Sequence, residues 1–318
     1  MQISPILPKF IPATNNLLNS DSSKKKYNQI PHDVFVKTPT FSAMNTFSHN
    51  YSHIKPIIKQ MYSERKVNLK SLEEVIQRFF PHINVRDMRE APLAKQSSEF
   101  GAYFQNQIGF SKTFEVKDMG QALFFRMPNE SADNTNLNFF INVVHEITHV
   151  IQENSSDRVK RSDWMRKTLQ NANDKNTVMA DLVVLPQIFS SLEQVVILPL
   201  REFMMKSDNL PREILVKVEP KLINDIYKKV TGANYDSYVD FCLSEIFKRI
   251  GFNCSKDSLS RVLKYSKQYA LDEYEAYKNG TDFGKEMLGI KSSTDLDLRV
   301  QAYRMLADRL DFLINITK

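Results

Sequence analysis

A motif of the form HExxH occupies positions 145–149, inside a run of mostly apolar residues from 137 to 153. In an α-helix, histidines four positions apart lie on one face about one turn from each other, so both imidazoles reach a single ion. Glu146 projects about 100° away from His145, towards a water bound at that ion. Zinc lowers the pKa of such a water, and a carboxylate accepts its proton as it attacks a carbonyl. The spacing predicts a zinc site with His145 and His149 as ligands and Glu146 as general base.

The helix expected around this motif is apolar on nearly all sides, which indicates that it is buried. Its apolar residues are Phe139, Phe140, Ile141, Val143, Val144, Ile147, Val150 and Ile151. Two histidines and a glutamate buried there without a common partner would be costly, and a metal ion supplies such a partner. The alternative is that the histidines are ordinary core residues with hydrogen-bond partners of their own.

A third ligand that follows the motif must be an acid, because the motif contains the last two of the six histidines. Asp157, eight residues beyond the motif, is one candidate. On a helix predicted over residues 257–280, Glu273 is the carboxylate at the centre of the apolar stripe, where an acid is costly unless it is paired or binds a metal. Glu275 faces the opposite, polar side. Glu273 is therefore the predicted ligand, and an ion pair between Glu273 and Arg304 is the alternative.

The motif at 145–149, followed far downstream by Glu273 and Ala276 in the pattern E-x-x-A, resembles the zincin metallopeptidases of the gluzincin type. With Gln152 included, it also resembles HExxHxxQ domains that are attached to bacterial toxins. The resemblance covers about a dozen positions. One departure is the distance from the motif to Glu273, which is longer than is common in those families.

The resemblance implies that His145, His149 and Glu273 bind one zinc ion per chain and that Glu146 is the general base for hydrolysis of a polypeptide. Members of these families also stabilise the oxyanion with a tyrosine, histidine or arginine. No histidine remains for that role in this sequence. The tyrosine candidates are Tyr269, Tyr274, Tyr277 and Tyr303.

Composition divides the chain into three parts. Residues 1–55 are rich in Pro, Ser, Thr and Asn, which predicts a disordered or targeting tail. Residues 56–157 combine a helix, short β-rich runs and the HExxH helix, whereas residues 158–318 are mostly helical. The β-rich runs are His82–Met88, Ala102–Phe110 and Gln121–Met127. We expect an α+β, predominantly helical fold, in which a zincin-like core with a small mixed β-sheet and an HExxH active-site helix is joined to a large helical C-terminal lobe that supplies the third ligand.

The bulk properties limit the partners of this chain. The net charge of +6 is mild for 318 residues, which predicts no nucleic-acid surface. The most apolar stretch, Met179–Leu200, contains Asp181, Glu193 and two prolines, which favours buried helix over a membrane span. The two cysteines form neither a disulfide framework nor a CxxC pair, which indicates a reducing compartment such as the cytoplasm. Export without a cleaved signal peptide, suggested by the tail composition, is the alternative location.

Two functions from different classes agree with these features. The leading hypothesis is a zinc-dependent metallopeptidase acting on a protein substrate, with an exported bacterial effector or toxin as one form of it. The alternative is a non-catalytic zinc-binding or protein-interaction module with a vestigial peptidase site. Three protein ligands leave a coordination position for water, which favours catalysis. With only eight glycines, the sequence contains neither GxGxxG nor GxxxxGK[ST], which argues against nucleotide-binding enzymes of those types.

Overall fold

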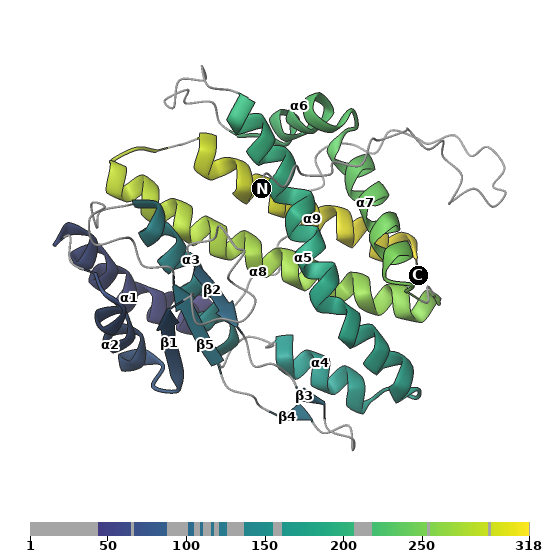
Figure 1. The fold of residues 1–318 in the computed structure, drawn as a ribbon, viewed down its shortest axis with the longest axis horizontal. Helices are drawn as coiled ribbons and strands as arrows, with labels where there is room; N and C mark the ends of the chain where they lie inside the picture. The colour runs from purple at the N-terminus through teal and green to yellow at the C-terminus, as the bar shows by residue number, and fades with distance from the viewer. Residues whose placement is uncertain are drawn as a thin grey trace, which may run out of the picture. The chain divides into compact units, whose positions relative to one another are not determined.

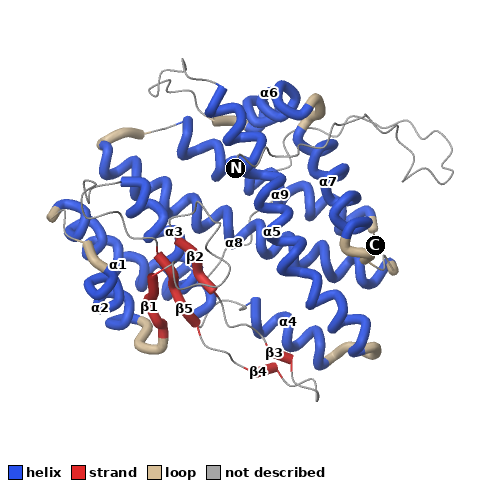
Figure 2. The backbone as a smooth tube through the Cα atoms, in the orientation of Figure 1, coloured by secondary structure: helices blue, strands red, loops and turns tan. Residues whose placement is uncertain are grey.

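The computed structural model describes a set of segments that excludes both chain ends. These are residues 44–64, 67–87, 101–104, 109–110, 116–117, 121–125, 137–154, 161–206, 218–252, 255–291 and 294–317. Helices dominate them (Figures 1 and 2), so the prediction of a predominantly helical chain is confirmed. All of them belong to one compact unit, residues 42–318.

The first helix begins inside the segment that composition assigns to a tail. α1 spans Met44–Ser63 and covers residues 44–55 of that predicted tail. Its buried residues Ile54, Ile58 and Met61 recur at helical spacing and supply apolar surface to a core. Residues 1–43 lie outside the described residues, so the export signal suggested for this segment stays a prediction.

α2 (Leu69–Phe79) follows directly and is held at its start by a capping interaction. Oδ1 of Asn68 accepts a hydrogen bond from the backbone N–H of Ser71 at 2.8 Å, which satisfies one of the unpaired donors of the first turn. The helix buries Leu72, Val75 and Ile76, which lie on one face at helical spacing. This face belongs to the same core as the buried residues of α1.

Short strands follow α2 (Figure 2). β1 (Ile83–Asp87) pairs in parallel with β5 (Gln121–Phe125), and β2 (Gly101–Phe104) pairs antiparallel with the other edge of β5. A separate short pair joins β3 (Gly109–Phe110) to β4 (Val116–Lys117). Residues 121–125 of the run predicted at 121–127 thus form a central strand with fully buried Leu123 and Phe125. The described residues of the run predicted at 102–110 belong to two strands, β2 and β3.

α3 (Leu137–Asn154) carries the HExxH motif and is buried on most sides, as its apolar sequence predicts. It contacts α1, β2 and the long helix α8 (Lys256–Leu288). With α1, α2, β1 and β5 it forms the first hydrophobic core, to which α8 adds the buried Phe283 and the partly buried Met287. The buried members of this core are Ile54, Ile58, Met61, Val67, Leu72, Val75, Ile76, Phe80, Ile83, Val85, Leu123, Phe125, Phe139, Phe140, Val143, Val144, Ile147, Val150, Ile151 and Phe283.

The second hydrophobic core is helical throughout. Its helices besides α8 are α4 (Arg161–Gln170), α5 (Lys175–Lys206), α6 (Pro220–Thr231), α7 (Tyr235–Arg249) and α9 (Thr294–Ile316). In Figure 1, α8 runs across the molecule from this helical region to the crossing with α3. Because α8 contributes to both cores, it fixes the HExxH helix against the helical part of the chain.

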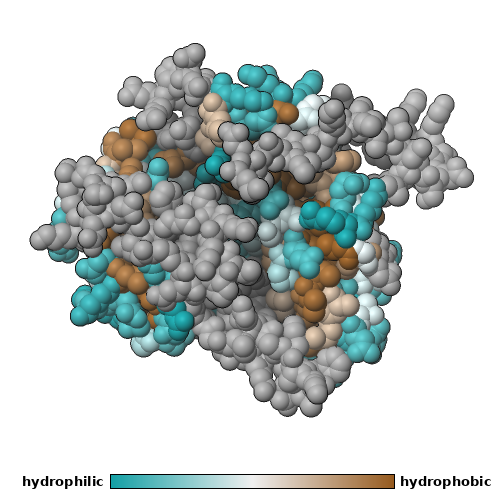
Figure 3. Space-filling view, in the orientation of Figure 1, coloured by the Kyte–Doolittle hydropathy of each residue, from teal (hydrophilic) through white to brown (hydrophobic). Residues whose placement is uncertain are grey.

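The apolar stretch predicted to be buried forms one continuous helix, α5, with Pro186 and Pro199 inside it. By length and composition alone, α5 could cross a membrane, since an 18-residue window of it has a mean hydropathy of 1.6. Of that window, 39% is buried inside the protein. One side of the helix fills the second core, where Leu185, Ile188 and Leu192 are fully buried. The other side is apolar in places: Val183 is 60% exposed. Hydrophobic surface follows part of α5 in Figure 3. A core helix meets the same criteria, so the absence of a membrane span stays a prediction.

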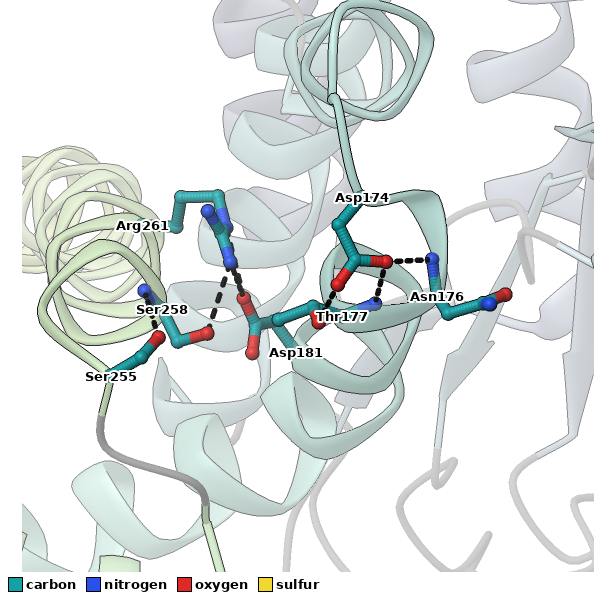
Figure 4. A network of polar contacts seen from close by, with 7 residues as sticks. All are labelled: Asp174, Asn176, Thr177, Asp181, Ser255, Ser258 and Arg261. Atoms are coloured by element: carbon teal, nitrogen blue, oxygen red, sulfur yellow. Dashed lines mark hydrogen bonds and ion pairs between the residues drawn. The ribbon is translucent and has the colours of Figure 1, made fainter.

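A buried ion pair joins α5 to α8 (Figure 4). Asp181 is only 3% exposed, and its Oδ2 accepts hydrogen bonds from Nε and Nη2 of Arg261 at 2.9 and 2.6 Å. Nη2 of Arg261 also donates to Oγ of Ser258 at 3.0 Å. This network explains why an acid is tolerated in the most apolar stretch of the sequence.

α8 continues through Asn279 and Gly280, where its sequence predicts the end, and finishes at Leu288, with Gly289 as a left-handed C-cap at a φ of 67°. Gly280 is not a cap but a point of close approach to α3. A Cβ atom at Gly280 would lie 2.8 Å from the backbone oxygen of Ile141, and one at Gly284 would lie 2.6 Å from Cδ1 of Ile141. The two glycines therefore let α3 and α8 cross at short range.

Candidate metal centre

The crossing of α3 and α8 brings together the side chains that the sequence selects. Nε2 of His145 and Nε2 of His149 are 3.2 Å apart on α3. Glu273 on α8 directs one carboxylate oxygen to each of them, with Oε2 at 3.5 Å from His145 and Oε1 at 3.4 Å from His149. The predicted ligand set thus meets at one point, although Glu273 comes from a different helix and a distant part of the chain.

These distances can be compared with the needs of a zinc ion. Ligand atoms about 2.0–2.1 Å from a tetrahedral zinc ion are separated from one another by about 3.3–3.4 Å. The two imidazole nitrogens lie 3.2 Å from each other, and each lies 3.4–3.5 Å from a different oxygen of the Glu273 carboxylate. Two imidazole nitrogens and a carboxylate are also a donor set that zinc commonly binds. The residues present therefore fit the ion in both type and spacing.

Glu146 lies beside these ligands. His145, Glu146 and His149 form a group whose ligand atoms all lie within 4.8 Å of one another. Glu146 is 7% exposed, so its carboxylate is withdrawn from bulk water. A carboxylate at this distance is close enough to contact a water at the site.

The same contacts favour a proton on His149. Burial lowers the pKa of His149, but the facing carboxylate of Glu273 and its hydrogen bond outweigh burial and raise this pKa to about 9. Burial would raise the pKa of Glu273, but the charge of His149 and the hydrogen bonds from both histidines hold it well below its usual range. The contacts between the two side chains therefore favour an imidazolium–carboxylate pair.

The two histidines differ in their other ring nitrogen. Nδ1 of His149 lies 2.8 Å from Oε1 of Gln152, whereas Nδ1 of His145 is buried and has no hydrogen-bond partner within the described segments. The ring of His145 packs edge-on against Tyr277, with ring centroids 4.4 Å apart. On the side away from Glu273, the ring of His145 is thus held by ring packing and that of His149 by a hydrogen bond.

The alternatives for the third ligand have separate outcomes. Arg304 is exposed on α9, and no ion pair joins it to Glu273 among the residues described. Glu273 instead faces His145 and His149, and its side chain is 15% exposed. Asp157 lies outside the described residues.

Of the tyrosines considered for oxyanion stabilisation, Tyr277 contacts a histidine of the site. Its ring packs against His145 and stacks on Tyr303, with centroids 5.0 Å apart. Tyr269 stacks instead on Phe189, with centroids 4.7 Å apart. Burial raises the pKa of Tyr269, Tyr277 and Tyr303, so these phenols stay neutral and keep a proton to donate.

The polar contacts behind His149 are not predicted from the sequence, which assigns no role to Gln152 itself and puts Glu275 on the solvent face. Gln152 is 7% exposed and contacts His149 on one side and α8 on the other, where Nε2 lies 3.0 Å from Oε2 of Glu275. The available signal was the spacing, because residues three apart on a helix are neighbours.

Comparisons with known proteins give no independent assignment. No protein-family model, no curated protein and no solved structure matches this chain. The case for a function therefore rests on the residues at the crossing of α3 and α8.

Proposed function

We propose that this protein is a zinc-dependent metallopeptidase that hydrolyses peptide bonds in a polypeptide substrate. The observation that carries the proposal is the spacing of 3.2–3.5 Å among Nε2 of His145, Nε2 of His149 and the carboxylate oxygens of Glu273. These three residues would hold one zinc ion. The general architecture of zincins, with a catalytic core around an HExxH helix, is part of the same proposal.

The chemistry divides between the ion and the chain. A bound zinc ion acts as a Lewis acid and brings the pKa of a water near neutrality. Glu146 accepts the proton of the attacking water and passes it to the leaving amine. The burial of Glu146 supports this role, because a proton acceptor in a site with little water acts more strongly on its neighbours than an exposed one.

His145, His149 and Glu273 position the reaction without taking part in proton transfer. They come from two packed helices, which limits their movement relative to one another. Three protein ligands leave one coordination position for water or for the substrate carbonyl, as in catalytic zinc sites; structural zinc sites are usually closed by four protein ligands. Tyr277, whose ring contacts His145, is our first candidate for donating a hydrogen bond to the oxyanion.

A non-catalytic zinc-binding or protein-interaction module is the alternative. Glu146 favours catalysis, since a purely structural zinc site has no need of a buried acid beside its ligands. The alternative predicts zinc binding without turnover and no functional effect of changing Glu146.

The test uses the full-length chain with zinc and a mixed peptide library, in which cleavage is detected by mass spectrometry. We expect the wild-type protein to cleave peptides and Glu146→Gln to lose at least about 100-fold in rate, because a general base contributes about 10²–10⁴-fold. The zinc content of Glu146→Gln should equal that of the wild type. Cleavage by Glu146→Gln at the wild-type rate would refute the mechanism, and zinc binding without any cleavage would favour the non-catalytic module.

A further inference from the structure

Gln152 connects a predicted metal ligand to the opposite helix. It lies on α3 one turn after His149 and is nearly buried, with 7% of its surface exposed. Its Oε1 is 2.8 Å from Nδ1 of His149. Its Nε2 is 3.0 Å from the backbone oxygen of Asp272 and 3.0 Å from Oε2 of Glu275. One amide thus bridges the imidazole of His149 on α3 and two residues of α8, Asp272 and Glu275, which lie close in sequence to Glu273.

The contacts on α8 determine how this amide is oriented. A backbone carbonyl and a carboxylate only accept hydrogen bonds, so the group of Gln152 that faces Asp272 and Glu275 must be the NH2 donor. If the amide were flipped, its oxygen would face the backbone oxygen of Asp272 and Oε2 of Glu275, which are both acceptors. Oε1 of Gln152 therefore faces His149, and the orientation follows from chemistry rather than from a choice between two equivalent fits.

The orientation of the amide in turn determines the tautomer of His149. An amide oxygen accepts and cannot donate, so Nδ1 of His149 carries the hydrogen. In the neutral ring this leaves the lone pair on Nε2, which is the atom that faces His145 and Glu273 at 3.2 and 3.4 Å. The chain of contacts from Glu275 through Gln152 thus prepares Nε2 to bind a cation.

We propose that Gln152 is a positioning residue for the metal centre, which fixes the tautomer and ring plane of His149 and ties that ring to the helix that carries Glu273. The inference rests on the zinc site of the proposed function but not on catalysis. Partners of this kind orient a ligating histidine, and their loss costs about 10–100-fold in metal affinity. His145 has no such partner among the described residues, so the bridge acts on one ligand of the pair.

The first experiment measures zinc affinity of the full-length protein by competition with a chromogenic chelator. Gln152→Leu should bind zinc about 10–100-fold more weakly than the wild type. Gln268→Leu is the matched control, because Nε2 of Gln268 donates to Oδ1 of Asp272 at 2.9 Å on α8 and contacts neither histidine. We expect this control to bind zinc as the wild type does.

A second pair of variants separates positioning from simple attachment of α3 to α8. Gln152→Glu should weaken zinc binding, because it removes both donors and sets a carboxylate against Glu275. Combining it with Glu275→Gln restores one of the two hydrogen bonds to α8 in reversed order: the introduced amide donates to the introduced carboxylate, whose other oxygen accepts from Nδ1 of His149. The hydrogen bond to the backbone oxygen of Asp272 is not restored. We expect the double variant to bind zinc more tightly than Gln152→Glu but less tightly than the wild type, since only one of the two hydrogen bonds to α8 returns.

Nitrogen NMR of the zinc-loaded protein gives a readout that attachment alone would not change. The wild type should show a hydrogen-bonded N–H at Nδ1 of His149, and Gln152→Leu should lose this protection. Equal zinc affinity in the wild type, Gln152→Leu and Gln152→Glu, or a double variant no better than Gln152→Glu, would overturn the proposal. Zinc binding by the wild type without peptide cleavage would refute the proposed peptidase and leave this inference intact, whereas a wild type that binds no zinc would refute both.

Discussion

Oε1 of Glu273 on α8 lies 3.4 Å from Nε2 of His149 on α3, although the two residues are far apart in the sequence. Because one residue lies on each helix, the distance between them depends on how closely α3 and α8 cross. Neither helix alone contains the complete set of proposed ligands. The site is therefore a product of tertiary packing between α3 and α8. Changes that widen this crossing should weaken the site even where they leave its ligands in place.

Replacement of Glu273 tests its assignment as the third ligand. Glu273→Ala should lower zinc affinity by more than about 100-fold, which exceeds the usual cost of losing a residue that only supports a ligand. Asp282→Ala is a matched control, because Asp282 is an exposed acid on the same helix. The measurement is zinc competition with a chelator, and unchanged affinity in Glu273→Ala would remove Glu273 from the ligand set.

Gly280 tests the importance of the close crossing. Gly280→Ala would set a Cβ atom 2.8 Å from the backbone oxygen of Ile141, which has little freedom to move. We expect a loss of about 2 kcal/mol or more in the free energy of unfolding, despite the gain of about 1 kcal/mol that alanine brings to a helix. Urea denaturation of the metal-free protein measures this loss. Stability equal to or above that of the wild type would show that the crossing is not tight.

Gly284 provides a variant that can be rescued. Gly284→Ala meets Cδ1 of Ile141 at 2.6 Å, the end of a side chain rather than backbone. Ile141→Val removes that atom, so the double variant should be more stable than Gly284→Ala alone. The same Ile141→Val change should not rescue Gly280→Ala, whose contact is with backbone. Equal effects of Ile141→Val on both alanine variants would contradict the geometry.

Much of this arrangement follows from the sequence. The spacing of His145 and His149 predicts the two histidine ligands on one face of a buried helix, and the apolar stripe on the later helix singles out Glu273. Both inferences depend on helical periodicity, which is a local property of the chain. The same periodicity shows that the carboxylate of Glu273 falls within the apolar stripe of its helix.

Predictions from the sequence are wrong where a residue's role depends on another helix. The pair Asn279-Gly280 predicts a helix stop, since Asn-Gly often ends helices, but the lack of a side chain at Gly280 accommodates Ile141 on α3. The helical wheel of α8 puts Glu275 on the solvent face, because it does not contain Gln152 on α3, to which Glu275 is hydrogen-bonded. Such roles come from long-range packing, which a helical wheel of one segment does not contain.

The ion pair between Asp181 and Arg261 should make a clear contribution to stability. Asp181→Asn leaves the guanidinium without its charged partner at a site where the carboxylate is buried, so we expect a loss of about 1–3 kcal/mol, reduced from the cost of a fully buried pair because Arg261 is partly exposed. The double variant Asp181→Leu with Arg261→Met should recover most of it, since it removes both charges. Urea denaturation provides the values, and a double variant less stable than Asp181→Asn would contradict this view.

The most direct test of the account is the zinc content of the full-length protein after incubation with zinc and removal of free metal, determined by elemental analysis. We predict about one zinc ion per chain for the wild type and for Glu146→Gln, because the ligands His145, His149 and Glu273 are intact in both. The same measurement on His149→Ala should give almost none. A wild-type protein that retains no stoichiometric zinc would contradict the central claim that the crossing of α3 and α8 forms a metal centre.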